Sequence, residues 1–188
     1  MEQKMKPKPR ERILQVAADL FYRQGYTQTG INQIIAEADI AIGSLYKHFP
    51  SKSDLLVAYL EMKENEWLED FEKFCKGTDN PKELIIKYVD FRIEHQQNTA
   101  FCGCPFIKIM SQLDTTDDKV QQIVEAHKSK QKALLYSFFK QIPDIGSWDK
   151  KQLSENFFVL VEGAIVTTTI LRNTQALESA RKFIKKII

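Results

Sequence analysis

The sequence predicts an all-α protein with about nine helices, grouped as an N-terminal three-helix head and a C-terminal helical bundle. Apolar residues recur at intervals of three and four along most of the chain, which is the spacing of one helix face. Only 7 of the 188 residues are Gly and 6 are Pro, and no long stretch alternates like a strand. A hydrophobic content of 43% with 28% charged residues excludes collagen-like and wholly disordered chains.

The first fifty residues predict a helix-turn-helix domain at residues 10–52. Residues 1–9 are basic and almost free of apolar side chains, so we expect a disordered basic arm. A first helix follows from about residue 11 to 24 and ends at Gly25. Thr29 is expected to cap a second helix over residues 31–38, and a third runs from Ile42 to Phe49, where Pro50 stops it. Three short helices with a tight turn before the third are typical of this motif.

The rest of the chain, residues 53–188, reads as longer helices separated by clear breaks. Ser51 and Asp54 form a near capping box at the start of a long helix. Asn80 and Pro81 open another, as cap and first helical residue. The remaining starts are assigned to Pro105, to Asp117 or Asp118, and to caps at Ser147 and Thr174, which gives helices over about 51–76, 81–98, 105–113, 118–140, 148–171 and 175–188.

Charge is concentrated in the head, which favours an anionic partner there. Residues 1–52 carry a balance of +3, whereas the remainder carries −1. The segment around Leu45 and Phe49 turns hydroxyl, imidazole and ammonium groups away from the core. Such groups bind phosphate oxygens. Lys52 lies in the first turn of the next helix, where a cation is unfavourable unless an anion is also present.

Two motifs in this region resemble the DNA-binding head of TetR-type (tetracycline-repressor-like) regulators. They are Ala17-Ala-Asp-Leu-Phe21 and Gly43-Ser-Leu-Tyr-Lys-His-Phe-Pro-Ser-Lys52. The resemblance covers about fifty residues and implies a homodimeric repressor that binds a double-stranded DNA operator. Its C-terminal part would bind a small-molecule inducer and dimerise. The positions expected to contact DNA are Thr29, Ile42, Gly43, Ser44, Tyr46, Lys47, His48 and Lys52.

The turn and the start of the third helix depart from the family's pattern. Asp39 replaces the usual Gly, and Asp tolerates a left-handed backbone better than most residues. Ala41 replaces the usual Ser or Thr and cannot cap, which costs about 1 kcal/mol and predicts a helix that DNA helps to order. Ile42 is an exposed apolar residue, for which we predict contact with a thymine methyl group. The alternative is an isolated surface apolar side chain.

The C-terminal part contains no motif of a catalytic centre, and no cofactor is predicted. It is rich in aromatic residues, most of which should form the core. A helical bundle also places ligand cavities between facing helices, where Phe and Met suit a bulky apolar compound. The residues chosen to line such a cavity are Tyr88, Phe91, Phe106, Met110 and Phe157.

Cys102 and Cys104 are the most chemically distinctive residues of the C-terminal part. Lys108 follows one helical turn after Cys104, and a cation lowers a thiol pKa, so the three are predicted to form a thiol sensor. The segment resembles that of electrophile-sensing family members that control N-ethylmaleimide reductase, which implies that Cys104 is the sensing cysteine. Two alternatives remain: inert buried thiols, and a metal site, for which the pair supplies only two ligands.

The last two helices predict the dimer interface, because the helix before residue 171 is apolar on more than one side. Three cysteines and a charged N-terminus predict a soluble, cytoplasmic protein without a signal peptide. Charges such as Glu162 should keep every apolar stretch too short to span a membrane, so no membrane partner is expected. The alternative function is a thiol-dependent small-molecule enzyme that uses Cys104 as nucleophile.

Overall fold

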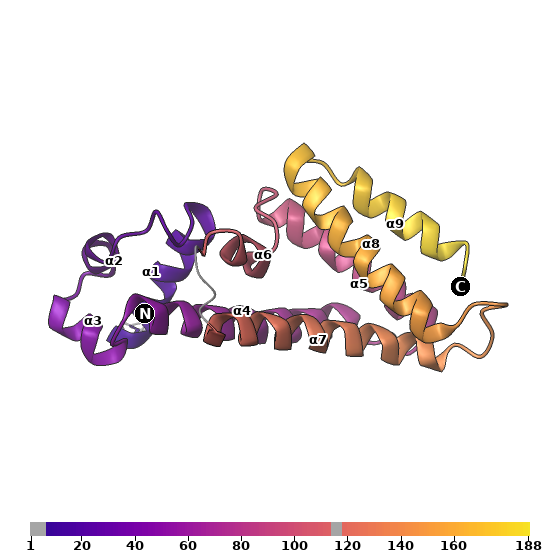
Figure 1. Cartoon of the computed structure of the whole chain (residues 1–188), viewed down its shortest axis with the longest axis horizontal. Helices are drawn as coiled ribbons and strands as arrows, with labels where there is room; N and C mark the ends of the chain where they lie inside the picture. Colours follow the sequence, from indigo (N-terminus) through magenta and orange to yellow (C-terminus); the bar gives the residue numbers. More distant parts are fainter. Residues whose placement is uncertain (1–6, 114–117) are drawn as a thin grey trace, which may run out of the picture. The chain divides into compact units, whose positions relative to one another are not determined.

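The computed structural model describes residues 7–113 and 118–188, and within them it confirms the all-α prediction. The described residues form nine helices and contain no strand (Figure 1). The helices are α1 Pro9–Arg23, α2 Ile31–Ala38, α3 Ile42–His48, α4 Lys52–Cys75, α5 Pro81–Asn98, α6 Pro105–Met110, α7 Asp118–Gln141, α8 Lys150–Leu171 and α9 Gln175–Lys185.

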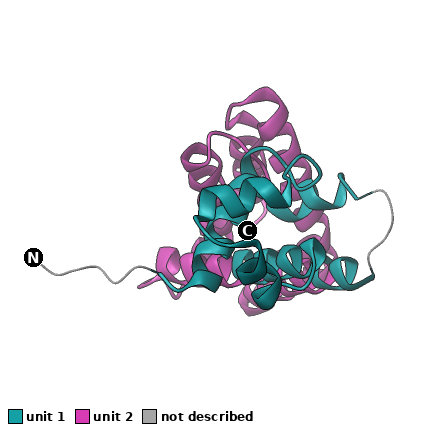
Figure 2. Cartoon of the chain, turned by 90° about the vertical axis from the view of Figure 1, so that its left-hand side faces the viewer, with its two compact units in different colours: residues 1–63, 105–124 teal, residues 64–104, 125–188 magenta. Residues whose placement is uncertain are grey.

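The chain divides into two compact units (Figure 2). The first unit comprises residues 1–63 and 105–124, and the second comprises residues 64–104 and 125–188. The first unit is therefore larger than the predicted 10–52 head, because it includes the start of α4 and all of α6. Most of the predicted basic arm, residues 1–6, lies outside the described part, and α1 already begins at Pro9.

Two predicted caps lie at neighbouring residues instead. The residue before α2 is Gly30 rather than Thr29. The cap of α8 is Asp149 rather than Ser147, and its carboxylate accepts a hydrogen bond of 2.8 Å from the Gln152 amide. The predicted Asn80 cap is confirmed, since its side-chain oxygen accepts from the Lys82 amide at 2.9 Å. These groups satisfy amides that the first helical turn leaves without partners.

The first unit is held together by apolar side chains from the three head helices and the start of α4. Phe21 of α1 is fully buried and meets the ring of Tyr59 edge-on, with 5.6 Å between ring centroids. Leu45 of α3 and Ile34 of α2 are also fully buried. Each such side chain contributes about 1.5–3 kcal/mol on burial. The exposed face of α3 is therefore supported by a well-packed apolar core.

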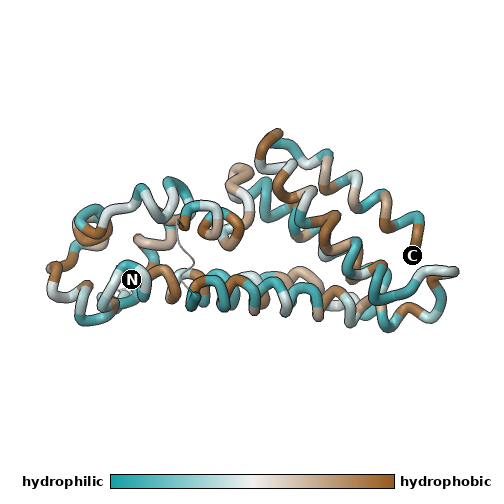
Figure 3. Tube along the Cα trace, in the orientation of Figure 1, coloured by the Kyte–Doolittle hydropathy of each residue, from teal (hydrophilic) through white to brown (hydrophobic). Residues whose placement is uncertain are grey.

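The second unit is a bundle in which α5, α8 and α9 pack against one another and α4 and α7 add aromatic side chains. Trp67 and Phe71 of α4 are stacked, with ring centroids 5.4 Å apart. Tyr88 and Phe91 of α5 meet both rings edge-on. Figure 3 shows hydrophobic positions along much of α8. This core positions the polar side chains described below.

By length and composition, α8 is long and apolar enough to cross a membrane. This corrects the expectation that charged residues keep every apolar stretch too short to span one. Helix α8 is the one described helix that meets both criteria. A core helix has the same composition, so this observation is weak evidence for a membrane span. In the second unit α8 buries Leu153, Phe157 and Val161 and packs against α5 and α9.

Candidate functional site

Helix α3 presents one polar face outward and is anchored by its apolar face. Leu45 is fully buried and Phe49, at the C-terminal cap, is 2% exposed. On the other side Tyr46 is 46% exposed and Ile42 is 56% exposed. The other candidates on this helix are also accessible: Gly43 and Lys47 are exposed, and Ser44 and His48 are half-buried. The structure thus brings all the α3 candidates together.

The turn before α3 is left-handed at Asp39, with φ 50° and ψ 60°. The guanidinium of Arg12 on α1 donates a hydrogen bond of 3.1 Å to the carbonyl of Asp39. This bond ties the turn to the first helix, and it was not anticipated from the sequence. Ala41 precedes α3 without a side-chain cap, as its lack of a polar group requires.

Thr29 is fully buried, which corrects its assignment as a residue whose side chain contacts DNA. Its hydroxyl donates to the Gly25 carbonyl at 2.6 Å and accepts from the Gln24 side chain at 3.2 Å. Both bonds close the loop between α1 and α2. The reason for the error is that a polar residue before a helix can turn inward to satisfy a loop carbonyl.

Two further cations pack against rings in the head. The ammonium of Lys52 lies 4.2 Å from the ring centroid of Tyr26, and partial burial lowers the pKa of Lys52. The guanidinium of Arg10 lies 5.1 Å from the centroid of Phe49. Cations above aromatic faces are attracted by the ring quadrupole. Arg10 adds positive charge beside the C-terminal end of α3, a contribution that the motif did not reveal.

Helix α6 is fastened to the C-terminal end of α1 inside the first unit. The ammonium of Lys108 donates to the Tyr22 carbonyl at 2.5 Å, and the Thr27 hydroxyl donates to the Gln112 carbonyl at 3.4 Å. A cation is stabilised at a helix C-terminus by the dipole. Lys108 therefore serves this junction, whereas the sequence suggested that it stands beside the Cys104 thiol.

The cation that contacts Cys104 is Lys128 of α7. Its ammonium donates to the Cys104 sulfur at 3.6 Å and to a Glu162 carboxylate oxygen at 2.6 Å. Cys102 and Cys104 are both half-buried. Because Lys128 follows Cys104 by 24 residues, no local spacing in the sequence could have identified it.

The loop that leads to Cys104 has an unusual backbone. Ala100 and Phe101 adopt φ values of 50° and 60°, and Gly103 has φ 83°. A Cβ atom at Gly103 would lie 2.9 Å from the Thr169 hydroxyl oxygen, so a larger residue would displace α8 or the loop. The sequence Cys-Gly-Cys therefore fixes the place of the thiols through a close backbone approach.

The third cysteine, Cys75, differs in environment. Burial raises the pKa of the Cys75 thiol, and Lys87 partly opposes that shift. A raised thiol pKa reduces the thiolate fraction and thus the reactivity at neutral pH.

The predicted lining residues fall in different parts of the fold. Tyr88, Phe91 and Phe157 belong to the aromatic core of the second unit. Phe106, buried, and Met110, half-buried, lie on α6 in the first unit. Their common role in binding an inducer stays a prediction.

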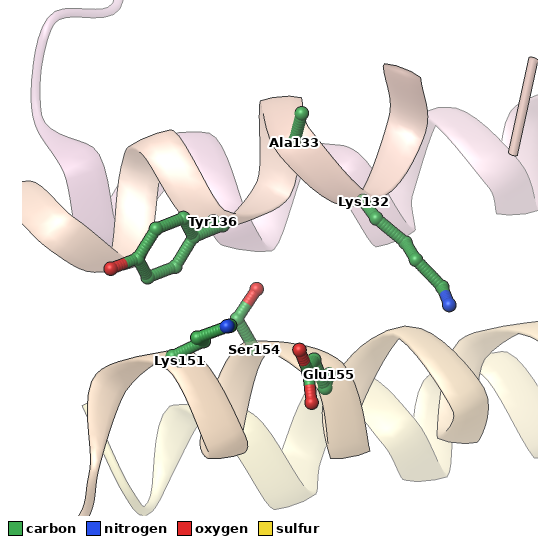
Figure 4. A pocket seen from close by; sticks show the side chains of 6 residues that line it. All are labelled: Lys132, Ala133, Tyr136, Lys151, Ser154 and Glu155. Atoms are coloured by element: carbon green, nitrogen blue, oxygen red, sulfur yellow. The ribbon is translucent and has the colours of Figure 1, made fainter. Parts of the chain in front are cut away.

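A pocket of about 180 Å³ lies between α7 and α8 in the second unit. Figure 4 shows Lys132 and Tyr136 on one wall, and Lys151, Ser154 and Glu155 on the other. Pockets for drug-sized ligands measure about 300–1,000 Å³ and are mainly apolar. The small volume makes this pocket a poor fit for a bulky inducer.

Comparison with known proteins agrees with the geometry of the head. Residues 13–59 match the profile of "Bacterial regulatory proteins, tetR family". The head is therefore similar to the N-terminal region of regulators of this family. The Bacillus subtilis regulator LmrA is 53% identical over 57 residues, which are 29% of this chain and 30% of LmrA. The Staphylococcus aureus regulator QacR is 34% identical over 64 residues, 34% of each chain.

Longer alignments have lower sequence identity. A transcriptional regulator of Lactococcus lactis is 26% identical over 118 residues, 62% of this chain and 60% of the relative. The chain thus spans one to two thirds of the length of these relatives. Reduced E. coli NemR superposes with a TM-score of 0.83 at 23% identity, covering 96% of this chain and 97% of NemR. SCO4454 of Streptomyces coelicolor gives 0.85 at 21%, covering 95% and 93%. These superpositions show the same fold over nearly the whole chain.

Proposed function

We propose that this chain is a transcriptional repressor that binds a near-palindromic DNA operator as a homodimer and is released by a small molecule or by thiol modification. The observation that carries the proposal is the exposed face of α3, held on buried Leu45 and Phe49 within a TetR-type head. A short helix with a polar outer face fits the major groove. Tyr46, Lys47, His48 and Lys52 would bind phosphates or base edges there.

Salt dependence of DNA binding tests this proposal. Lys47 and Lys52 supply two cations in each head, so a dimer neutralises about four phosphates and the logarithmic salt slope should be roughly −4. Replacing Lys47 by Ala should make the slope less negative by about two, because each of the two heads loses one cation. Lys140→Ala, an exposed change on α7, is the matched control and should leave the slope unchanged. An operator affinity that does not change with salt concentration would overturn the proposal.

Ile42 is proposed to read a thymine methyl group, as its 56% exposure at the start of α3 permits. Operators selected from a random duplex pool would be tested with each thymine replaced by uracil. The native chain should lose affinity at one position in each half-site, and Ile42→Ala should abolish that difference. If replacing thymine by uracil lowers the affinity of the native chain and of Ile42→Ala equally, the proposed contact is refuted.

The homodimer is proposed on a second apolar face of α8. Val159, Val166 and Ile170 are exposed and follow one another at intervals of seven and four residues, with exposed Gly163 in the same stripe. Val159 is 66% and Ile170 71% exposed. Phe183 adds an exposed ring on α9. An apolar stripe of this kind is covered in a symmetric partner, and Gly permits close approach of two helices.

The sensor is proposed at Cys104. Its sulfur accepts a hydrogen bond of 3.6 Å from the Lys128 ammonium, which places a cation beside the atom that attacks electrophiles. Addition to N-ethylmaleimide forms a carbon–sulfur bond, and the neighbouring ring carbon takes up a proton. Cys104 is bonded to Pro105, the first residue of α6, and α6 is fastened to α1 through Lys108. Bulk added at the sulfur would therefore strain a segment that continues into the DNA-binding unit.

Mass spectrometry after brief N-ethylmaleimide treatment, combined with an operator-release assay, tests the sensor. We expect Cys104 to react before Cys75, and operator release to follow Cys104 modification. Cys104→Ser should be insensitive, whereas Cys75→Ser, the matched control, should respond like the native chain. Modification of Cys104 with full retention of the operator would exclude it as the sensor.

A further inference from the structure

The interior of the second unit contains an unusual group of buried and half-buried polar side chains, which we call the Arg92 cluster. It comprises Trp67 of α4, Tyr88 and Arg92 of α5, Lys128 and Gln131 of α7, and Glu162 of α8. Four buried atoms of the cluster have no hydrogen-bond partner among the residues that the structure describes: Trp67 Nε1, Arg92 Nε, Gln131 Oε1 and Glu162 Oε1. Leaving such an atom without a partner costs about 1–3 kcal/mol. The group thus has the hydrogen-bonding capacity of a binding site.

Arg92 lies at the centre of the cluster. Its guanidinium carbon is 4.8 Å from the Trp67 ring centroid and 5.2 Å from that of Tyr88, and Nη2 donates to the Tyr88 hydroxyl at 3.3 Å. The residue is 7% exposed. Cation–π contacts hold the planar group in place but leave donors in its plane available. A flat, aromatic-walled donor site of this kind suits a carboxylate on a ring.

The charges of the cluster do not cancel. Arg92 and Lys128 are cations, and Glu162 is the one carboxylate among the cluster's members. Burial lowers the pKa of Arg92, but Tyr88 and Glu162 outweigh that effect and the net shift is upward, so the charge persists. His127, which contacts Gln131, is neutral, because burial and the cations Lys128, Arg92 and Lys130 lower its pKa to about 3. The cluster therefore has one positive charge in excess.

A neighbouring ion pair does not remove this excess. Glu64 of α4 is bound by the Lys130 ammonium at 2.9 Å, so these two charges neutralise each other. Glu162 is occupied on one oxygen by Lys128 at 2.6 Å. A buried net charge is unfavourable unless it is paired. One further negative charge would balance the interior and also accept the free donors of Arg92 and Trp67.

We propose that the Arg92 cluster binds a small aromatic carboxylic acid in its anionic form, with Arg92, Lys128 and the Trp67 indole N–H on the carboxylate. Its role as the effector of DNA release rests on the proposed repressor function, whereas the binding itself does not. This assigns the inducer a negative charge, in addition to the apolar or electrophilic character expected from the sequence. Because Lys128 also contacts Cys104, an acid bound here would lie next to the proposed sensor sulfur.

Fluorescence of Trp67 provides a direct assay. The chain has two tryptophans, so Trp148→Phe leaves Trp67 as the single indole, and Trp148 is exposed and outside the cluster. Sodium benzoate is the probe and benzamide is its neutral analogue of the same shape. We expect a saturable change with benzoate at a Kd below about 1 mM, and binding of benzamide at least about tenfold weaker. This comparison uses one folded protein and needs no change in the site.

Three variants in the same background separate charge recognition from damage to the core. Arg92→Gln should weaken benzoate binding at least about tenfold, as expected for a charge-assisted bond. Glu162→Gln should tighten it, because it removes a competing anion and releases Lys128. A merely disrupted core would not bind more tightly. Lys140→Gln, an equal loss of charge on exposed α7, should change the Kd less than about twofold.

The outcomes are decisive in either direction. No saturable change with benzoate, equal binding of benzamide, or weaker binding in Glu162→Gln would each overturn the site and indicate that ordered water satisfies these atoms. Benzoate binding without operator release would refute the effector role. An absence of DNA binding by the native chain would refute the repressor proposal while leaving the benzoate titration valid.

Discussion

The pH dependence of stability should be set in large part by His127. This residue is 2% exposed and its pKa is lowered to about 3 by burial and by the neighbouring Lys128, Arg92 and Lys130. Its Nδ1 lies 3.7 Å from a Glu64 oxygen, but the low pKa means that the ring is neutral and no ion pair forms at neutral pH. The unfolded chain has an ordinary histidine with a pKa of about 6.5.

The sign and size of the effect follow from proton linkage. Between pH about 6.5 and 3 the unfolded state binds the proton and the folded state does not, so stability falls as the pH decreases through this window. From pH 7 to pH 5 the loss is about 2 kcal/mol for a histidine that stays neutral in the fold. For a protein of this size that equals a decrease of about 4–8 °C in Tm.

Thermal unfolding monitored by circular dichroism at pH 7, 6 and 5 measures this effect. His127→Gln should remove most of the decrease between pH 7 and 5, whatever the substitution does to stability at pH 7. His48→Gln, in the first unit, is the matched control and should retain the contribution of His127. A native chain whose Tm is equal at pH 7 and pH 5, or a His127→Gln chain with an undiminished decrease, would show that the buried ring is not held neutral.

Three further changes test other contacts. Arg12→Ala removes the bond to the Asp39 carbonyl and should lower operator affinity about fivefold per half-site. The control Arg23→Ala removes the exposed ion pair with Asp19 and should have little effect. Equal losses of affinity for the two variants in gel-shift titrations would contradict this prediction. Ile170→Glu should convert the dimer to a monomer by light scattering, and an unchanged mass would exclude the α8 stripe from the interface. Lys128→Gln should slow alkylation of Cys104 several-fold, because it removes the ammonium that contacts the sulfur. Lys132→Gln, on the next turn of α7, is the control and should leave the rate unchanged. Identical alkylation rates for the native chain and Lys128→Gln would show that the ammonium does not activate the sulfur.

Local patterns in the sequence predicted the helices of the head and the buried side of α3. The spacing of Leu45 and Phe49 determines which side of α3 is buried, and the polar residues between them are then exposed by geometry alone. Asn80 followed by Pro81 likewise defines a helix start without any tertiary information. In each case the signal and the structure it determines lie within one or two helical turns.

The polar interior could not be predicted in this way, because its partners are far apart in the chain. Lys108 follows Cys104 by four residues, which is about one helical turn. Lys128 follows it by 24 residues and reaches the sulfur only through the packing of α7. Thr29 turned inward because a loop carbonyl was available. One signal was present: Arg92 continues the buried series Ile85 and Tyr88 at helical spacing, and a charged residue in an apolar series indicates a buried site.

The missing cap at Ala41 bears on how easily the proposed repressor could be switched. If ordering the start of α3 absorbs about 1 kcal/mol in each head, a dimer gives up about 2 kcal/mol, or roughly thirtyfold in operator affinity. The free-energy difference between the DNA-bound and released states is then smaller, so an inducer of modest affinity is enough to release the DNA. Tighter DNA binding would make the proposed switch less responsive, so the alanine at position 41 would allow a weakly bound inducer to release the proposed repressor.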